Sequence, residues 1–194
     1  MVRLKMPWDV TSKKIVTIHI GEYFASSEPV VVSTFLGSCV AACLFDPENR
    51  IGGMNHILVP GKANFKDFNV EARFGINAME LLINAMMKLG ANRYRIKGKV
   101  FGGAHVIPLL SAEGAVGRKN ADFILEFLER ENIDVVSQDM GGHNSRRIYF
   151  HTDSAQVFLR RGHTLASRRI AKLEQEKLKR IRANLEEAGK ITWF

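Results

Sequence analysis

The stretch from Val30 to Pro60 carries the strongest folding signal in the chain. Two short apolar runs rich in β-branched residues, Val30–Thr34 and Val40–Phe45, lie on either side of Leu36-Gly37-Ser38-Cys39. Short apolar runs that are bounded by glycine and by turn residues are typical of buried β-strands. The stretch therefore predicts strands that enter a core, with a sharp change of chain direction at Gly37-Ser38.

The rest of the chain mixes strand and helix signals without a regular βαβ order. Apolar residues at three- and four-residue spacing from Val70 to Leu89 predict a helix that ends at Gly90. A second helix is expected to begin with Asn120 as its N-cap, and Asp139-Met140-Gly141-Gly142 is expected to form a hairpin or a tight loop. The other predicted strands are Ile15–Ile20, Gly53–Val59, Tyr94–Phe101, Ile133–Ser137 and Arg147–His151. This order favours a layered α/β or α+β sandwich with a largely antiparallel β-sheet core and helices packed on it.

The length of 194 residues suits one domain of about 150 residues with an appendage. We expect a flexible N-terminal segment over 1–14, a folded domain over 15–161 and a basic amphipathic helix or tail over 162–194. A hydrophobic content of 46% and a charged content of 25% are those of a soluble globular protein. No apolar run is long enough for membrane insertion and no secretory signal is evident, so a cytoplasmic location is expected.

The net charge of +8 is concentrated near the C-terminus. Ten Lys or Arg and four Asp or Glu lie between Arg160 and Lys190, so this segment holds six of the eight net charges. The apolar stripe of Thr164–Ala188 predicts an amphipathic helix outside the core. It could bind an acidic surface or a partner protein, or stay solvated. Nucleic-acid binding is the weakest alternative, because no aromatic residues are interleaved with the basic ones, and no nucleic-acid partner is expected.

Cys39 and His56 form the candidate catalytic pair. A buried cysteine is more often a small core residue than a nucleophile, but Gly37-Ser38 before Cys39 suggests an exposed thiol at a turn. A thiolate held by a neighbouring histidine is well suited to attack an amide at neutral pH. Backbone N–H groups of Gly37-Ser38-Cys39 could stabilise the oxyanion, and the hydroxyl of Ser33 or Thr34 could orient the imidazole.

Metal, redox and phosphate chemistry have weaker support. The six histidines show no HxH or HExxH spacing, and Cys39 and Cys43 are four apart rather than in a CxxC pair. We therefore expect no metal and no cofactor, and Cys43 is predicted to be packing. Gly102-Gly103 matches no phosphate-loop pattern and is expected to allow close backbone approach near a cleft, with Asn120, Arg146 and Arg147 nearby as turn or surface residues. Gly37, Ser38, Gly102 and Gly103 are the predicted substrate-binding residues.

Six blocks of sequence together carry a family resemblance. In order along the chain they are LGSCVAACLFDP, GGMNHILVP, EARFGINAMELLINAMMKLGA, KVFGGA, GRKNADFILEFLERENI and DMGGHNSRRIYFHT. They resemble the chemoreceptor glutamine deamidase family, CheD, over most of residues 15–160. The resemblance implies an α/β sandwich similar to the deamidase domain of cytotoxic necrotising factor toxins. It also implies hydrolysis of glutamine side chains on chemotaxis receptors to glutamate and ammonia.

The resemblance also assigns roles to individual residues. Cys39 matches the family's nucleophile and His56 its general base. Ser33 falls where family members have a threonine or serine that completes a triad, although Thr34 is adjacent. A glycine is usual in the family at about the position of Ala155. The implied partners are the cytoplasmic helices of receptors, as substrate, and a CheC-type phosphatase; the alternative function is a non-catalytic adaptor that binds receptors and regulates that phosphatase.

Overall fold

The computed structural model describes residues 13–59, 63, 65–66, 69–105, 114–162 and 164–188. Most of the predicted segment 1–14 and the residues from Gly189 onward therefore lie outside the described residues. The strands are β1 (Lys14–Thr17), β2 (Tyr23–Ser26), β3 (Val30–Leu36), β4 (Val40–Asp46), β5 (Ile51–Asn55), β6 (Lys97–Gly102), β7 (Val135–Met140), β8 (Arg146–His151) and β9 (Val157–Arg161). The helices are α1 (Val70–Lys88), the 3₁₀ helix η1 (Arg93–Arg95), α2 (Gly114–Arg130) and α3 (Thr164–Ala188).

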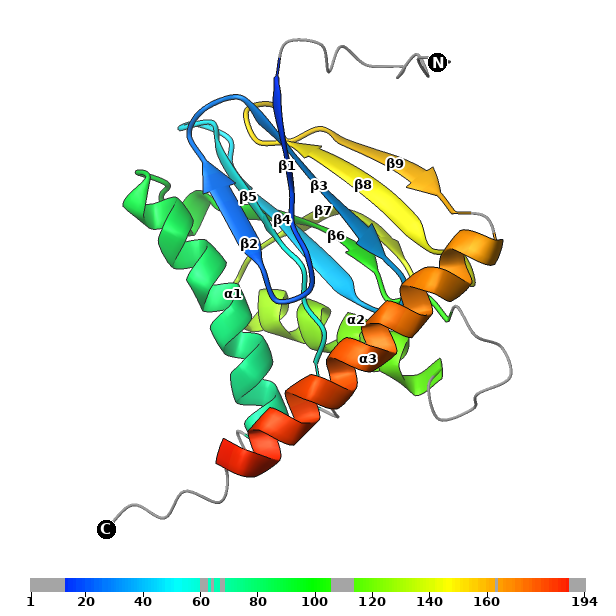
Figure 1. Cartoon of the computed structure of the whole chain (residues 1–194). Helices are drawn as coiled ribbons and strands as arrows, with labels where there is room; N and C mark the ends of the chain where they lie inside the picture. Colours follow the sequence, from blue (N-terminus) through cyan, green and yellow to red (C-terminus); the bar gives the residue numbers. More distant parts are fainter. Residues whose placement is uncertain are drawn as a thin grey trace, which may run out of the picture.

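The strands form two sheets that are packed face to face (Figure 1). One sheet has the order β1-β3-β8-β9 and the other has the order β2-β5-β4-β6-β7. Pairing is antiparallel except between β1 and β3 and between β6 and β7. The predicted α+β sandwich with a largely antiparallel core is confirmed.

Two apolar clusters hold the layers together. One lies between the two sheets and includes Val32, Leu36 and Phe150. The other lies between the five-stranded sheet and the helices α1 and α2, and includes Leu44, Met86 and Phe127. β4 contributes alternate residues to both clusters, because successive side chains of a strand point to opposite faces. A strand buried on both faces explains why the sequence of β4 is continuously apolar.

The helix predicted from Val70 to Leu89 is confirmed as α1, and Asn69 caps its N-terminus through a hydrogen bond from the Ala72 amide. The structure contradicts the prediction for Asn120 and excludes the hairpin, one of the two alternatives predicted at Gly141-Gly142. α2 begins at Gly114, so Asn120 is a buried residue inside the helix and not an N-cap. β7 and β8 belong to different sheets, so the loop between them at Gly141-Gly142 does not close a hairpin.

α3 has the bounds predicted for the C-terminal amphipathic helix, but its position differs from the prediction. It crosses the end of the sandwich at which β3 finishes, as the orange-to-red helix in Figure 1 shows. Ala171 and Glu174 on its inner face are each 3% exposed, and Leu178 packs against the cluster between the sheets. The helix is therefore part of the folded domain and covers the Cys39 loop.

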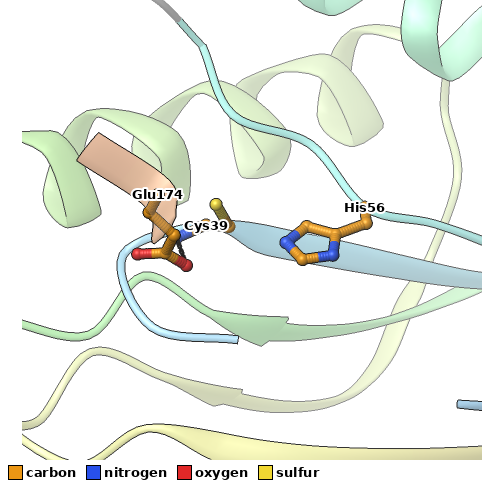
Figure 2. A group of neighbouring side chains, drawn as sticks. All are labelled: Cys39, His56 and Glu174. Carbon is orange, nitrogen blue, oxygen red and sulfur yellow. Dashed lines mark hydrogen bonds between the residues drawn. The ribbon is translucent and has the colours of Figure 1, made fainter. Parts of the chain in front are cut away.

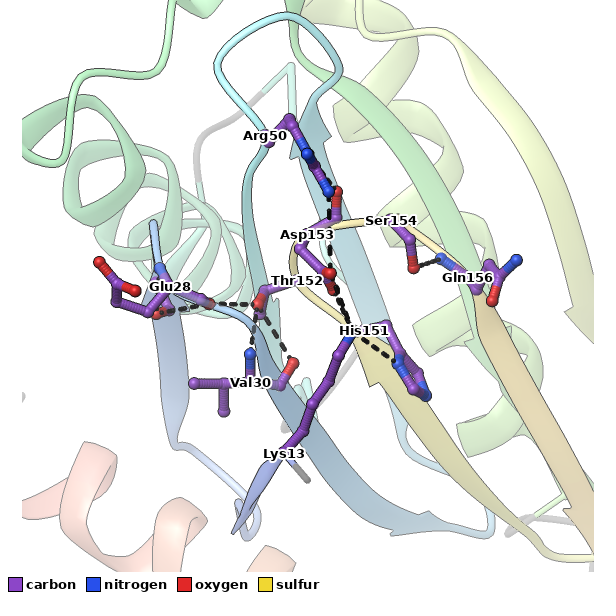
Figure 3. A network of polar contacts seen from close by, with 10 residues as sticks. Lys13, Glu28, Val30, Arg50, His151, Thr152, Asp153, Ser154 and Gln156 are labelled. Carbon is purple, nitrogen blue, oxygen red and sulfur yellow. Dashed lines mark hydrogen bonds and ion pairs between the residues drawn. The ribbon is translucent and has the colours of Figure 1, made fainter. Parts of the chain in front are cut away.

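A polar network joins the strands at the opposite end of β3 (Figure 3). The Thr152 hydroxyl donates to the carbonyl of Glu28 at 2.8 Å and accepts from the Val30 amide at 3.0 Å. Lys13 forms an ion pair of 2.7 Å with Asp153. Ala155 in the same turn has a φ of 55°, which is the left-handed region that favours glycine. A glycine at about this position, as the resemblance implies, would adopt this conformation without strain.

None of the helices in the described part of the chain is both long enough and apolar enough to cross a membrane.

Candidate active site

Cys39 lies where the chain passes from one sheet to the other. Gly37, Ser38 and Cys39 connect β3 of the four-stranded sheet to β4 of the five-stranded sheet. Val40 and Ile57 then pair through two backbone hydrogen bonds of 3.0 and 2.8 Å. This register places Cys39 and His56 diagonally on the same face, because directly opposed residues of an antiparallel pair share a face. The predicted pair is thus brought together by strand pairing.

The orientation of the His56 ring is fixed by Thr34. The Thr34 hydroxyl donates to the carbonyl of Ile18 at 2.8 Å, and it lies 2.8 Å from His56 Nδ1. A hydroxyl has one proton to donate, so towards His56 it must accept, and Nδ1 carries the hydrogen. The neutral ring then has its lone pair on Nε2, which has no hydrogen-bond partner among the described residues. This is the tautomer that a general base towards Cys39 requires.

Burial lowers the pKa of His56 to about 3, and the charge of His19 acts in the same direction. The ring is 3% exposed, and water cannot stabilise an imidazolium there. His56 is therefore neutral at physiological pH while α3 covers the site.

Of the two candidate hydroxyls, that of Thr34 lies beside the imidazole and that of Ser33 does not. Adjacent residues in a strand point to opposite faces, so only one of Ser33 and Thr34 can face His56. The Ser33 hydroxyl accepts a hydrogen bond of 3.2 Å from Nε of Arg147 and has no contact with the imidazole. The hydroxyl beside the ring belongs to Thr34.

The backbone amides of the Cys39 loop converge on one carboxylate, that of Glu174 from α3. Oε1 accepts from the amides of Gly37 at 2.9 Å and Cys39 at 3.2 Å. Oε2 accepts from the Ser38 amide and from the Ser38 hydroxyl, both at 2.7 Å. A Cβ on Gly37 would lie 2.8 Å from Oε2, so glycine makes room for the bound group. We call the Gly37–Cys39 amides and the Ser38 hydroxyl the amide pocket.

The thiol of Cys39 is buried, contrary to the expectation that Gly37-Ser38 would expose it. Figure 2 shows the Glu174 carboxylate and the His56 imidazole on either side of Cys39. Burial raises the pKa of the Cys39 thiol well above its usual range, and the negative charge of Glu174 and its hydrogen bond raise it further. With α3 in place, Cys39 is a neutral thiol.

Gly102 and Gly103 support the Cys39 loop from behind. The Gly103 amide donates to the Cys39 carbonyl at 2.8 Å, and the Ala104 amide donates to the Gly37 carbonyl at 2.8 Å. Gly102 has a φ of 115°, and a Cβ there would collide with the Cys39 carbonyl. Both glycines are buried. The predicted close approach of the backbone is present, but it is to the nucleophile loop, and the structure shows no contact of these glycines with the cavity beside α3.

Asn120 binds the Cys39 loop directly, and Arg146 binds the end of β6 that lies behind it; the sequence had suggested turn or surface residues at both positions. Asn120 Nδ2 donates to the Ser38 carbonyl at 2.8 Å, and its Oδ1 accepts from the Val59 amide at 2.8 Å. Arg146 is 1% exposed and donates from Nη1 to the carbonyls of Gly102 and Asp139 at 2.6 and 2.7 Å. The sequence did contain a signal for Asn120, because a polar residue on the inner face of a helix usually has a buried hydrogen-bond partner.

Glu174 was not singled out from the sequence either. It lies four residues after Ile170 and four before Leu178, inside the apolar stripe of an otherwise basic helix. An acidic residue at that position is the signal that could have identified it. The neighbouring Leu173, although apolar, is 63% exposed.

Two features around the pair bear on ligand binding. A cavity of about 670 Å³ lies between the end of β1 and α3, and it reaches Thr34 and His56. One ligand atom each from Cys39, His56 and Glu174 lie within 4.8 Å of one another, and thiolate, imidazole and carboxylate are zinc ligands. A zinc ion bound there would coordinate Cys39 and His56, so neither would be free to act as the nucleophile or the base in amide hydrolysis.

The fold and the site together define an α+β protein with the layout of a thiol-dependent amidohydrolase: a thiol, an imidazole of fixed tautomer and converging backbone amides. The profile of the family described as CheD chemotactic sensory transduction matches residues 58–161. The chain belongs to this CheD family. The matched region begins two residues after His56, so Cys39 and His56 lie outside it.

Curated relatives cover more of the chain. A "Probable chemoreceptor glutamine deamidase CheD 1" from Shewanella oneidensis is 41% identical over 185 residues, which is 94% of this chain and 88% of that protein. A protein of the same description from Ruegeria sp. is 43% identical over 87% of each chain. A "Probable chemoreceptor glutamine deamidase CheD" from Vibrio cholerae is 40% identical over 75% of this chain and 65% of its own length.

Proposed function

We propose that this protein deamidates selected glutamine side chains of chemotaxis receptors to glutamate, with release of ammonia. Family membership and the descriptions of the relatives support the reaction and the substrate. The observation that carries the proposal is the chain of contacts from Ile18 through Thr34 to His56, beside a thiol whose loop presents backbone amides. The adaptor alternative is not favoured, because the relatives are described as deamidases.

Cys39 is the nucleophile in this proposal. His56 Nε2 takes the thiol proton, and Sγ attacks Cδ of the glutamine side chain to form a tetrahedral intermediate. Its oxyanion lies in the amide pocket, where the N–H groups of Gly37 and Cys39 already converge on one oxygen. Substrate must replace Glu174 there. Burial is the main cause of the raised pKa of Cys39 and the charge of Glu174 is the second, so departure of the Glu174 carboxylate removes the second cause.

His56 then takes part in three further proton transfers. It gives its proton to the leaving nitrogen, the C–N bond breaks, and ammonia departs from a thioester on Cys39. His56 next takes a proton from water, whose oxygen attacks Cδ. The C–S bond breaks, His56 returns the proton to Sγ, and the new carboxylic acid loses its proton to solvent, which leaves glutamate and the free thiol. Thr34 stabilises the imidazolium in both steps by accepting from Nδ1–H. No step requires a metal or a cofactor, so a chelator should leave the rate unchanged.

The substrate is proposed to be the cytoplasmic helical domain of the receptor, which places the enzyme in the cytoplasm. A CheC-type phosphatase is the second proposed partner, on the basis of the family resemblance alone. Co-purification of the full chain with such a phosphatase tests this, and a lack of binding at micromolar concentrations would remove it.

The reaction is tested with the full chain and a purified receptor cytoplasmic fragment. Each deamidated glutamine adds about one dalton to its peptide, because –NH₂ is replaced by –OH, and one ammonia is released. Peptide mass spectrometry and an ammonia assay should agree in stoichiometry. Unchanged receptor peptides after prolonged incubation would contradict the proposal.

A further inference from the structure

Glu174 is a buried carboxylate that is held without a cation. It is 3% exposed, and no ion pair in the described part of the chain includes it. Buried carboxylates are usually paired with a positive charge, since removal from water is costly. Glu174 instead receives four hydrogen bonds, all from Gly37, Ser38 and Cys39. It is thus bound as an anion in the amide pocket.

A glutamate side chain in this pocket has the chemistry of the reaction product. Hydrolysis of a glutamine thioester on Cys39 leaves a glutamate carboxylate beside the sulfur, with its oxygens on the same amides. We propose that α3 is a product-like helix bound in its own active site, and that the groove beneath it is the seat of a substrate helix. This inference rests on the proposed function and deepens it, because it specifies a helical substrate that must displace α3.

The contacts around Glu174 define how a helix sits in this groove. Ala171, one turn before Glu174, is 3% exposed, and its small side chain lets the helix approach closely. Leu178, one turn after it, packs against the cluster between the two sheets. Lys172 and Lys177 are exposed, and Lys177 lines the cavity beside α3. A substrate helix in the same register would present a small residue, then the glutamine, then an aliphatic residue at positions i−3, i and i+4.

Glutamate suits the role of a resident occupant better than glutamine does. Both carboxylate oxygens accept hydrogen bonds from loop donors. A glutamine amide would present its –NH₂ to one of those backbone donors, and two donors cannot satisfy each other. α3 begins at Thr164, soon after β9 ends at Arg161, so its effective concentration at the pocket is of millimolar order. Substrate helices compete against this tethered occupant.

The first test converts the occupant into a substrate. In full-length Glu174→Gln, Cys39 Sγ should attack Cδ of residue 174, the C–N bond should break with loss of ammonia, and water should then cleave the thioester. Peptide mass spectrometry should find residue 174 as glutamate, about one dalton heavier than encoded. The converted fraction should not depend on protein concentration, because the reaction is intramolecular. The matched variant Glu176→Gln, on an exposed position of α3, should keep its glutamine.

The double variant Glu174→Gln with Cys39→Ala should also keep its glutamine. If glutamine 174 persists in a preparation that deamidates a receptor fragment, the inference is wrong and the proposed function stands. If neither residue 174 nor the receptor is converted, the proposed function fails as well. A conversion rate that rises in proportion to protein concentration would place the reaction between molecules and would also contradict the inference.

The second test removes the occupant. Alanine at 174 deletes the four hydrogen bonds but preserves helix propensity, so α3 should remain a helix and leave the pocket. We expect alkylation of Cys39 by iodoacetamide and deamidation of a receptor fragment to become about tenfold faster or more in Glu174→Ala. Glu176→Ala should behave as the unaltered chain does. Equal rates in Glu174→Ala and the unaltered chain would show that α3 does not restrict the site.

Discussion

The two cysteines are four residues apart, and both are buried and reduced, yet they lie in different kinds of environment. Cys43 is inside β4, paired with Met54 of β5 and Lys99 of β6, and burial alone raises the pKa of its thiol. Cys39 precedes the same strand and is covered on one side by α3. Burial by a sheet lasts as long as the fold does, whereas burial by a helix held at one carboxylate can be reversed.

This difference explains how one segment provides both core packing and chemistry. Strand pairing continues on both sides of Cys43, so its thiol has no route to a substrate. The chain at Cys39 has left β3 and not yet entered β4, so its amides are free of sheet pairing and can bind an acyl group. Cys39 therefore differs from Cys43 in two respects: the backbone amides beside it are not used in sheet pairing, and the helix that buries it, α3, can move away.

Replacing each cysteine gives the largest expected contrast. Cys39→Ala should lower receptor deamidation at least about 10³-fold, because no other group can form the thioester. Cys43→Ala should keep the rate within about twofold and lower the free energy of unfolding by about 1 kcal/mol, through a small cavity. Rates come from peptide mass spectrometry, and stabilities from urea unfolding. Equal losses of activity in the two variants would remove the distinction between the two cysteines.

His56 should matter for both rate and pH dependence. His56→Gln should lower deamidation by about 10²- to 10⁴-fold, since glutamine cannot transfer protons. The folded-state pKa of His56 is lowered to about 3. The unfolded chain therefore binds a proton that the folded chain does not, and stability falls as pH drops below about 6.5.

Between pH 7 and pH 5, this His56 contribution should cost about 2 kcal/mol of unfolding free energy. Urea unfolding of His56→Gln should show a pH dependence that is smaller by that amount. The same pH dependence in both proteins would mean that the ring is not kept neutral by burial.

Thr34 and Ser33 offer a matched test of the hydroxyl beside the ring. Thr34→Val keeps the shape of the side chain but removes the acceptor that fixes His56 Nδ1–H, so deamidation should fall about tenfold or more. Thr34→Ser should restore most of the rate. Ser33→Ala loses only the contact with Arg147 and should have little effect on activity. A larger loss in Ser33→Ala than in Thr34→Val would reverse the assignment.

The smallest expected effect concerns the far end of β3. Ala155→Gly relieves a left-handed backbone conformation but increases the entropy of the unfolded chain. The net result should be stabilisation by about 0.5–1 kcal/mol, with no change in deamidation rate. A destabilised variant would show that packing of the Ala155 methyl group outweighs the backbone strain.

The sequence predicted features that depend on local pattern. The helix from Val70 could be predicted because its apolar spacing and the glycine that ends it, Gly90, are visible within one short segment. Cys39 and His56 could be singled out because their residue types and the glycine before Cys39 are also visible in the sequence. β2 and β9 were not predicted, since they are short strands held mainly by their pairing with β5 and β8. Thr34 could be chosen over Ser33 only once the facing strands were known.

Glu174 and Asn120 required the tertiary structure. Their partners, the loop amides and the Ser38 carbonyl, are more than 80 residues away in the sequence. The spacing of α3 and α2 shows that these polar residues face inward but not what they meet. The position of α3 over Cys39 follows from the sheet order β1-β3-β8-β9, in which Arg146 of β8 pairs with Leu36 at the end of β3 and with Arg161 at the end of β9.

The thioester on Cys39 is the most direct test of the account. The full chain is mixed with a receptor cytoplasmic fragment, the reaction is quenched in acid to preserve a thioester, and the products are analysed by mass spectrometry. We predict an enzyme–receptor adduct that hydroxylamine cleaves, that maps to Cys39, and that persists in Cys43→Ala but not in Cys39→Ala. An adduct on Cys43, or receptor deamidation that continues undiminished in Cys39→Ala, would contradict it.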